Sequence, residues 1–85
     1  MAKPQKILEE AKRSPHDVRM NDAVKLAEAY GFVFRAGGKH SMIGKRKGYP
    51  SLLSFQTSGD GKVKEYQIKQ LLDAIEELDA LPDDV

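Results

Sequence analysis

The fold is decided by the stretch Phe32-Val33-Phe34-Arg35-Ala36-Gly37-Gly38-Lys39-His40-Ser41-Met42-Ile43. Its first four residues combine aromatic and β-branched side chains, which favour a strand. Because successive strand residues point to opposite faces, we expect Phe32 and Phe34 to share the core face. Gly37-Gly38 is a hairpin turn signal, so the chain should reverse there and continue as a second strand over Lys39–Lys45.

The residues after the turn should complete the hairpin and add a third strand to the sheet. In the second strand, alternation places His40 and Met42 on one face. Gly44–Pro50 is expected to be a basic loop or an irregular strand end. Leu52–Gln56 is expected to form a third strand.

Three segments have the periodicity of amphipathic helices. The first runs from Gln5 to Arg13 and should stop at Ser14-Pro15, because the residue before a proline avoids helical geometry. The second should run from Asn21 as its N-cap to Tyr30, with Gly31 as the residue that ends it. The third carries an apolar stripe that should lie in the core: Ile68, Leu71, Leu72, Ile75, Leu78 and Leu81.

This order of elements predicts the α+β fold class. We expect a three-stranded antiparallel sheet with helices on one face, which leaves the other face open for a ligand. Residues 1–85 should form a single domain, with an N-terminal helical extension over residues 1–20 and an acidic tail over residues 82–85.

The composition excludes several classes of protein. The chain has 85 residues and no cysteine, which rules out a disulfide scaffold and a thiolate metal site. No apolar run approaches the ~18 residues that a membrane span needs, and the N-terminus lacks the apolar segment of a signal peptide. The two separated histidines give no metal-ligand spacing. We therefore expect a cytoplasmic protein that contacts no membrane and needs no metal or other cofactor.

Charge is segregated along the chain, although the net charge is only +1. Residues 31–59 contain no acid, and their cations are Arg35, Lys39, Lys45, Arg46 and Lys47. Residues 73–85 contain acids and no base. One region therefore suits an anionic partner such as RNA, and another repels it. A run of charge can also be simply a solvated face.

Four motifs resemble those of the HicA family of bacterial toxins. In chain order they are the stretch from Ala23 to Phe32, Gly37-Gly38-Lys39-His40, Leu52–Gln56, and the stretch from Tyr66 to Leu72. The resemblance covers roughly residues 18–78. It implies a double-stranded-RNA-binding-like α-β-β-β-α fold, messenger-RNA endonuclease activity and inhibition by a HicB antitoxin. No DNA contact of its own is expected.

The resemblance also implies that His40 is the catalytic residue, since the family places a histidine after a glycine turn. Many members carry two adjacent histidines. Either Ser41 has replaced the second one, or Gly37-Gly38-Lys39-His40 matches a Gly-x-x-His pattern that lacks nothing. A histidine titrates near neutral pH, so it could take the proton of an RNA 2′-hydroxyl without a metal.

Neighbouring residues are the candidates for holding the RNA. Lys39 is adjacent to His40, although it should point to the opposite face, and the Ser41 hydroxyl could bind but not catalyse. Lys45, Arg46 and Lys47 could follow the phosphate backbone, and Lys62 and Lys64 lie where a helix N-terminus can assist. Tyr49 could stack on a base or pack against the sheet edge.

Three hypotheses follow from these patterns. The first is a toxin ribonuclease that uses His40. The second is a non-catalytic RNA-binding module of the same fold, which the single histidine would suit. The third is a protein whose basic face is covered by an acidic partner protein, and it is compatible with the first if that partner is a HicB-like antitoxin.

Overall fold

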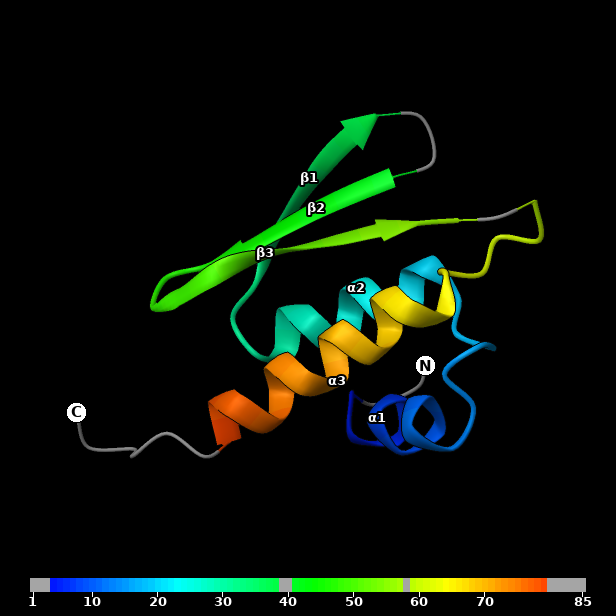
Figure 1. Ribbon diagram of the computed structural model, residues 1–85, viewed down its shortest axis with the longest axis horizontal. Helices are drawn as coiled ribbons and strands as arrows, with labels where there is room; N and C mark the ends of the chain where they lie inside the picture. The colour runs from blue at the N-terminus through cyan, green and yellow to red at the C-terminus, as the bar shows by residue number, and fades with distance from the viewer. Residues whose placement is uncertain (1–3, 39–40, 58, 80–85) are drawn as a thin grey trace.

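The fold is known from a computed structural model that describes residues 4–38, 41–57 and 59–79 (Figure 1). The three strands form one antiparallel sheet in the order β1-β2-β3, and all three helices lie on the same side of it. The expected α+β class is confirmed. The elements are α1 (Pro4–Arg13), α2 (Met20–Ala29), β1 (Val33–Gly38), β2 (Ser41–Arg46), β3 (Tyr49–Gln56) and α3 (Glu65–Asp79).

The core lies between the sheet and the layer formed by α2 and α3. On α3, Ile68, Leu71 and Ile75 are buried, as their spacing predicted, and Leu72 and Leu78 are partly buried against them. Leu81 and the acidic tail lie outside the described residues. The first helix is part of this core too, because Ile7 and Ala11 are buried where α1 packs on α2 and α3.

The end of α2 is set by Gly31, as expected. Its φ of 96° is a left-handed conformation that glycine adopts without steric cost. The Gly31 N–H donates to the Glu28 carbonyl at 3.0 Å, and the Phe32 N–H donates to the Ala27 carbonyl at 3.2 Å. This pair of bonds is a Schellman motif. It turns the chain directly from the helix into β1 and places Phe32 in the core.

The N-cap expected at Asn21 is wrong. The cap is Arg19, in an extended conformation and with no side-chain cap bond, and the helix begins at Met20. Arg19 pairs with Lys62, and the Met20 N–H donates to the Gly61 carbonyl. This pairing with a distant loop fixes where helical geometry starts and satisfies a helix-end donor, so no capping side chain is needed.

The reversal expected at Gly37-Gly38 is also misplaced, because both glycines belong to β1. Gly38 pairs with Ser41, after a register shift between Ala36 and Gly38, so the chain reverses later. A Cβ on Gly37 would lie 2.6 Å from the side chain of Ile43. The absence of a side chain at Gly37 therefore makes room for a neighbour across the sheet.

Most of the expected loop over residues 44–50 is sheet. β2 continues to Arg46 and β3 begins at Tyr49, so that only Lys47 and Gly48 form the turn. Gly48 has a φ of 90°, which explains the glycine at this position. The pairing register of β2 and β3 shifts between Gly44 and Arg46. The two strands therefore stay paired beyond the residues where the sequence stops alternating between apolar and polar side chains.

On the side of the sheet that faces the helices, an aromatic ring of β1 lies directly over a glycine of β2. Gly44 pairs with Phe34 of β1 and with Leu53 of β3, and it is buried. The Phe34 ring lies over Gly44 and stacks on Phe55 at a centroid distance of 5.3 Å. A Cβ on Gly44 would meet that ring at 2.5 Å. A glycine in the central strand thus allows an aromatic pair to form across it.

We predict that Gly44→Ala destabilises the protein by about 1–3 kcal/mol, because the added methyl forces the Phe34 ring out of its place. The measurement is the free energy of unfolding in urea. Gly59→Ala is the matched control, since a Cβ there meets nothing within 4 Å. Equal stability of the two variants would contradict this account of Gly44.

Candidate nucleic-acid interface

The candidate site is the sheet face that no helix covers. Alternation points Phe34, Gly44 and Leu53 toward the helices, so their neighbours in each strand point the other way. Several of these neighbours, together with atoms of Gly31, Phe34 and Lys47, line a depression of about 550 Å³. We call this surface the open face. Its lining residues are Gly31, Val33, Phe34, Arg35, Ile43, Lys45, Lys47 and Leu52.

Three cations on this face form no ion pair with a carboxylate among the residues that the structure describes. Arg35, Lys45 and Lys47 are all exposed. The nearest chain segment, residues 31–59, contains no Asp or Glu. Within residues 4–38, 41–57 and 59–79, the ion pairs are Lys62–Asp17 and Lys69–Glu65, and neither involves these three cations. Their charges are available to a polyanion.

Apolar side chains lie among these cations. Val33 is 72% exposed and Leu52 is 60% exposed, and Ile43 between them is half-buried. Exposed aliphatic side chains that share one concave patch are typical of a binding surface, whereas single exposed ones are found on any protein surface. A ligand that has both phosphates and flat, weakly polar bases would match this combination of charge and apolar surface.

Arg46 does not belong to the open face, although Lys45 and Lys47 beside it in the sequence do. Its Nε donates to the Tyr30 carbonyl at 2.6 Å, and its Nη1 donates to the Lys47 carbonyl at 3.0 Å. The side chain lies over Gly31, where a Cβ would come within 3.0 Å of Nε. Arg46 therefore ties β2 to the end of α2, and the residue is half-buried.

The other candidates, Ser41, Lys62 and Lys64, lie toward the opposite end of the sheet. Ser41 pairs with Gln56 at the end of β3, and the Lys64 N–H donates to the Gln56 carbonyl. Lys62 forms an ion pair with Asp17 at 2.9 Å. Since a strand rises ~3.3 Å per residue, the seven steps of β3 separate this end from the Lys47 turn by roughly 23 Å. The structure thus divides the candidates into two groups.

His40 and Lys39 lie outside the described residues. Gly38 and Ser41, which flank them in the chain, are paired with each other at the end of the sheet near Gln56. His16, the other histidine, is exposed. No cluster of three or more His, Cys, Asp or Glu side chains suited to a metal ion occurs within the described ranges.

No family model matches this chain. Comparisons with curated proteins and with solved structures find no significant match either. Across the described parts of the chain, every helix is too short or too polar to cross a bilayer. What the open face does must therefore follow from its own residues.

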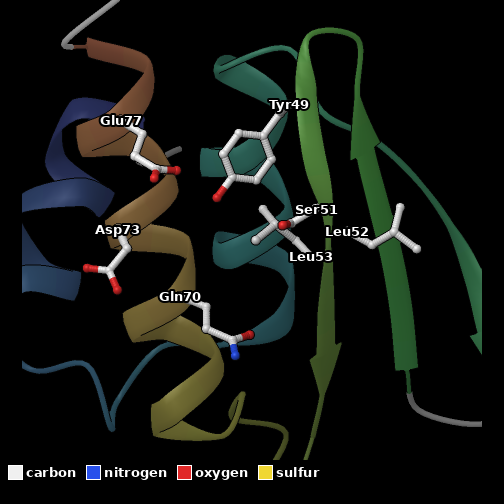
Figure 2. Close-up of a pocket in the computed structure, with 7 residues that line it drawn as sticks. All are labelled: Tyr49, Ser51, Leu52, Leu53, Gln70, Asp73 and Glu77. Carbon is white, nitrogen blue, oxygen red and sulfur yellow. The ribbon is translucent and has the colours of Figure 1, made fainter.

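Tyr49 is not placed for stacking on a ligand at the open face. Its ring packs edge-on against Phe32, with centroids 5.6 Å apart, and it extends from β3 toward α3 (Figure 2). Burial raises the pKa of the Tyr49 hydroxyl, and the hydrogen bond with Glu77 and the negative charges of Glu77 and Asp73 raise it further. Of the two alternatives for Tyr49, packing at the sheet edge is the one observed.

Two groups of surface residues were not assigned to a site from the sequence. Arg35 had a usable signal, because it follows Phe34 in a strand and must point away from the core. The second signal was a polar row on α3, formed by Gln70, Asp73 and Glu77 at positions i, i+3 and i+7. That this row lines a groove beside β3 depends on how the helix packs, which the periodicity does not give.

We predict that Arg46→Ala lowers the free energy of unfolding by about 1–2 kcal/mol, because the Tyr30 carbonyl loses a charged hydrogen-bond donor. Lys45→Ala is the control, since an exposed side chain with no such bond should change stability by less than ~0.5 kcal/mol. Urea unfolding of both variants gives the comparison. A destabilisation of the same size in both would show that Arg46 has no special structural role.

Proposed function

We propose that this chain binds RNA on the open face and cleaves messenger RNA as a HicA-like toxin. The observation that carries the proposal is the acid-free surface with Arg35, Lys45 and Lys47 around exposed aliphatic side chains. Cations on such a face hold phosphates, and the aliphatic groups give bases an apolar surface. The motifs that resemble the HicA family support the catalytic part of the proposal.

The proposed reaction is attack of an RNA 2′-hydroxyl on the adjacent phosphate. His40 takes the hydroxyl proton as general base, the new 2′-oxygen–phosphorus bond forms, and the 5′-oxygen of the next nucleotide leaves with a proton from water. Cations near the phosphate stabilise the negative charge that grows in the transition state. The reaction needs no metal in this scheme.

A HicB-like antitoxin would neutralise the toxin by covering the same surface. The cations of the open face favour an acidic partner, and a partner seated there would exclude RNA. The ribonuclease and partner hypotheses are therefore compatible. The alternative is an RNA-binding module without catalysis, which the single histidine of the motif would suit.

The first test replaces Arg35, Lys45 and Lys47 together by glutamine. RNA affinity should fall, and its salt dependence should flatten. Each phosphate contact on a single strand contributes about 0.7 to the slope of log K against log salt, so three lost contacts lower the slope by about 2. Fluorescence anisotropy with a labelled single-stranded RNA at several salt concentrations measures both quantities.

A matched control removes the same charge elsewhere. Lys6, Lys12 and Arg13 are exposed on α1, on the far side of the helix layer from the sheet (Figure 1). Their triple glutamine variant should keep most of the affinity and of the slope. Equal losses in the two variants would mean that net charge, and not the open face, governs binding.

The second test concerns His40. The purified chain, free of any antitoxin, is incubated with messenger RNA in EDTA beside a folded His40→Ala variant. Loss of a general base should slow cleavage by ~10²–10⁴-fold while RNA binding persists. Equal cleavage by both proteins would contradict the role of His40. Binding without cleavage by the unaltered chain, with or without ribosomes, would favour the non-catalytic module.

A further inference from the structure

One edge of the sheet carries unused backbone hydrogen-bonding groups. β3 is the last strand in the order β1-β2-β3. The Gln56 N–H donates to the Gln67 Oε1 at 2.6 Å, and the Gln56 carbonyl accepts from the Lys64 N–H at 3.2 Å. Both groups therefore point away from β2. The N–H and C=O groups of successive strand residues point alternately to the two sides of the strand. Ser54 and Leu52 therefore also direct their N–H and C=O away from β2, toward the unpaired edge of the sheet.

This edge is unpaired over a short window. Within the described ranges, no strand pairs with β3 on the side away from β2 between Pro50 and Phe55. Pro50 lacks an N–H and suits an edge position. The Gln56 groups are occupied by Gln67 and Lys64. The groups left for an added strand are those of Leu52 and Ser54, together with the Pro50 carbonyl.

A groove runs beside this window. Its volume is about 270 Å³, and it lies between β3 and α3 (Figure 2). Gln70, Asp73 and Glu77 follow one another along α3 and line the groove. Figure 2 shows Gln70 and Glu77 extending toward β3, the Asp73 carboxylate turned away from the strand, and Tyr49 pointing into the groove. Leu52 also lines the groove, but its side chain is directed away from α3.

The groove is acidic. Its charged lining residues are Asp73 and Glu77, and no Lys or Arg lines it among the described residues. The nearest lysine on the same helix, Lys69, is paired with Glu65 at 3.1 Å. The electrostatic character of this edge is therefore opposite to that of the open face. RNA would be repelled from the edge, whereas a cationic peptide would be attracted.

We propose that the edge of β3 accepts an extended basic peptide segment of a partner protein, which adds to the sheet as a fourth strand beside Leu52 and Ser54. Backbone hydrogen bonds would hold the segment, and alternate side chains would lie over α3. Alternate residues of a strand are ~6.8 Å apart. Asp73 and Glu77 are four residues apart on a helix, which corresponds to ~6 Å. Lys or Arg at positions i and i+2 of the segment would thus reach both carboxylates.

The test uses a capped synthetic peptide, Thr-Lys-Val-Lys-Val-Lys-Thr, and the isotope-labelled full chain. NMR titration gives the affinity, and amide hydrogen exchange reports the new bonds. We expect the N–H groups of Leu52 and Ser54 to exchange more slowly with peptide bound. A peptide of the same composition with no two lysines at positions i and i+2, Thr-Lys-Lys-Val-Val-Lys-Thr, should bind more weakly, because it cannot place two successive alternate cations over α3.

Two double variants separate the groove from general charge. Asp73→Asn with Glu77→Gln should weaken binding of the alternating peptide by roughly fivefold, as expected for two partly exposed ion pairs. Glu76→Gln with Asp79→Asn removes the same charge from exposed positions of α3 that do not line the groove, and should have little effect.

Three outcomes would overturn the proposal: equal binding of the two peptides, equal losses in the two double variants, or unchanged exchange at Leu52 and Ser54. The proposal does not depend on RNA binding, because none of its residues belongs to the cations of the open face. The glutamine variant of Arg35, Lys45 and Lys47 should still bind the alternating peptide, so the two proposals can fail separately.

Discussion

The close approach of Phe34 to Gly44 is the constraint on which the rest of this small sheet depends. Because the central strand offers no side chain at Gly44, the ring of Phe34 can cross it and stack on Phe55 of the third strand. This contact seals the side of the sheet that faces α2 and α3. Because successive strand residues point to opposite faces, the neighbouring residues Arg35 and Lys45 must then lie on the open face.

The short basic run Lys45-Arg46-Lys47 shows how a charge cluster in a sequence divides in space. Arg46 is held by the Tyr30 carbonyl at the end of α2, while Lys45 and Lys47 lie on the open face. The planar guanidinium suits the structural task, because it donates in two directions to fixed carbonyls. A cation count along the chain therefore overstates the charge that a ligand would meet.

The protein has two surfaces of opposite character, although its net charge is +1. Cations and exposed aliphatic groups share the open face, and carboxylates line the edge between β3 and α3. A polyanion and a basic peptide would be directed to different places. In the function proposed above, RNA or an acidic antitoxin occupies the first surface, and the second is left for a separate partner.

The sequence by itself determined the element types, their order, the apolar stripe of α3 and the end of α2 at Gly31. These features depend on local periodicity and on the conformations open to glycine, which act over a few residues. The sequence did not predict the features that depend on contacts between segments distant in the chain. The start of α2 is set by pairing of Arg19 and Met20 with residues 61 and 62, and Gly37 makes room for Ile43 instead of forming the turn.

Tertiary structure alone decided which cations share a surface and which polar row faces a groove. Arg46 left the basic cluster for a carbonyl sixteen residues away in the chain. Gln70, Asp73 and Glu77 became a groove wall only because α3 packs beside an unpaired strand edge. The physical reason is that local patterns fix which side of an element is apolar, whereas the partner of each polar side is fixed by how the elements pack together.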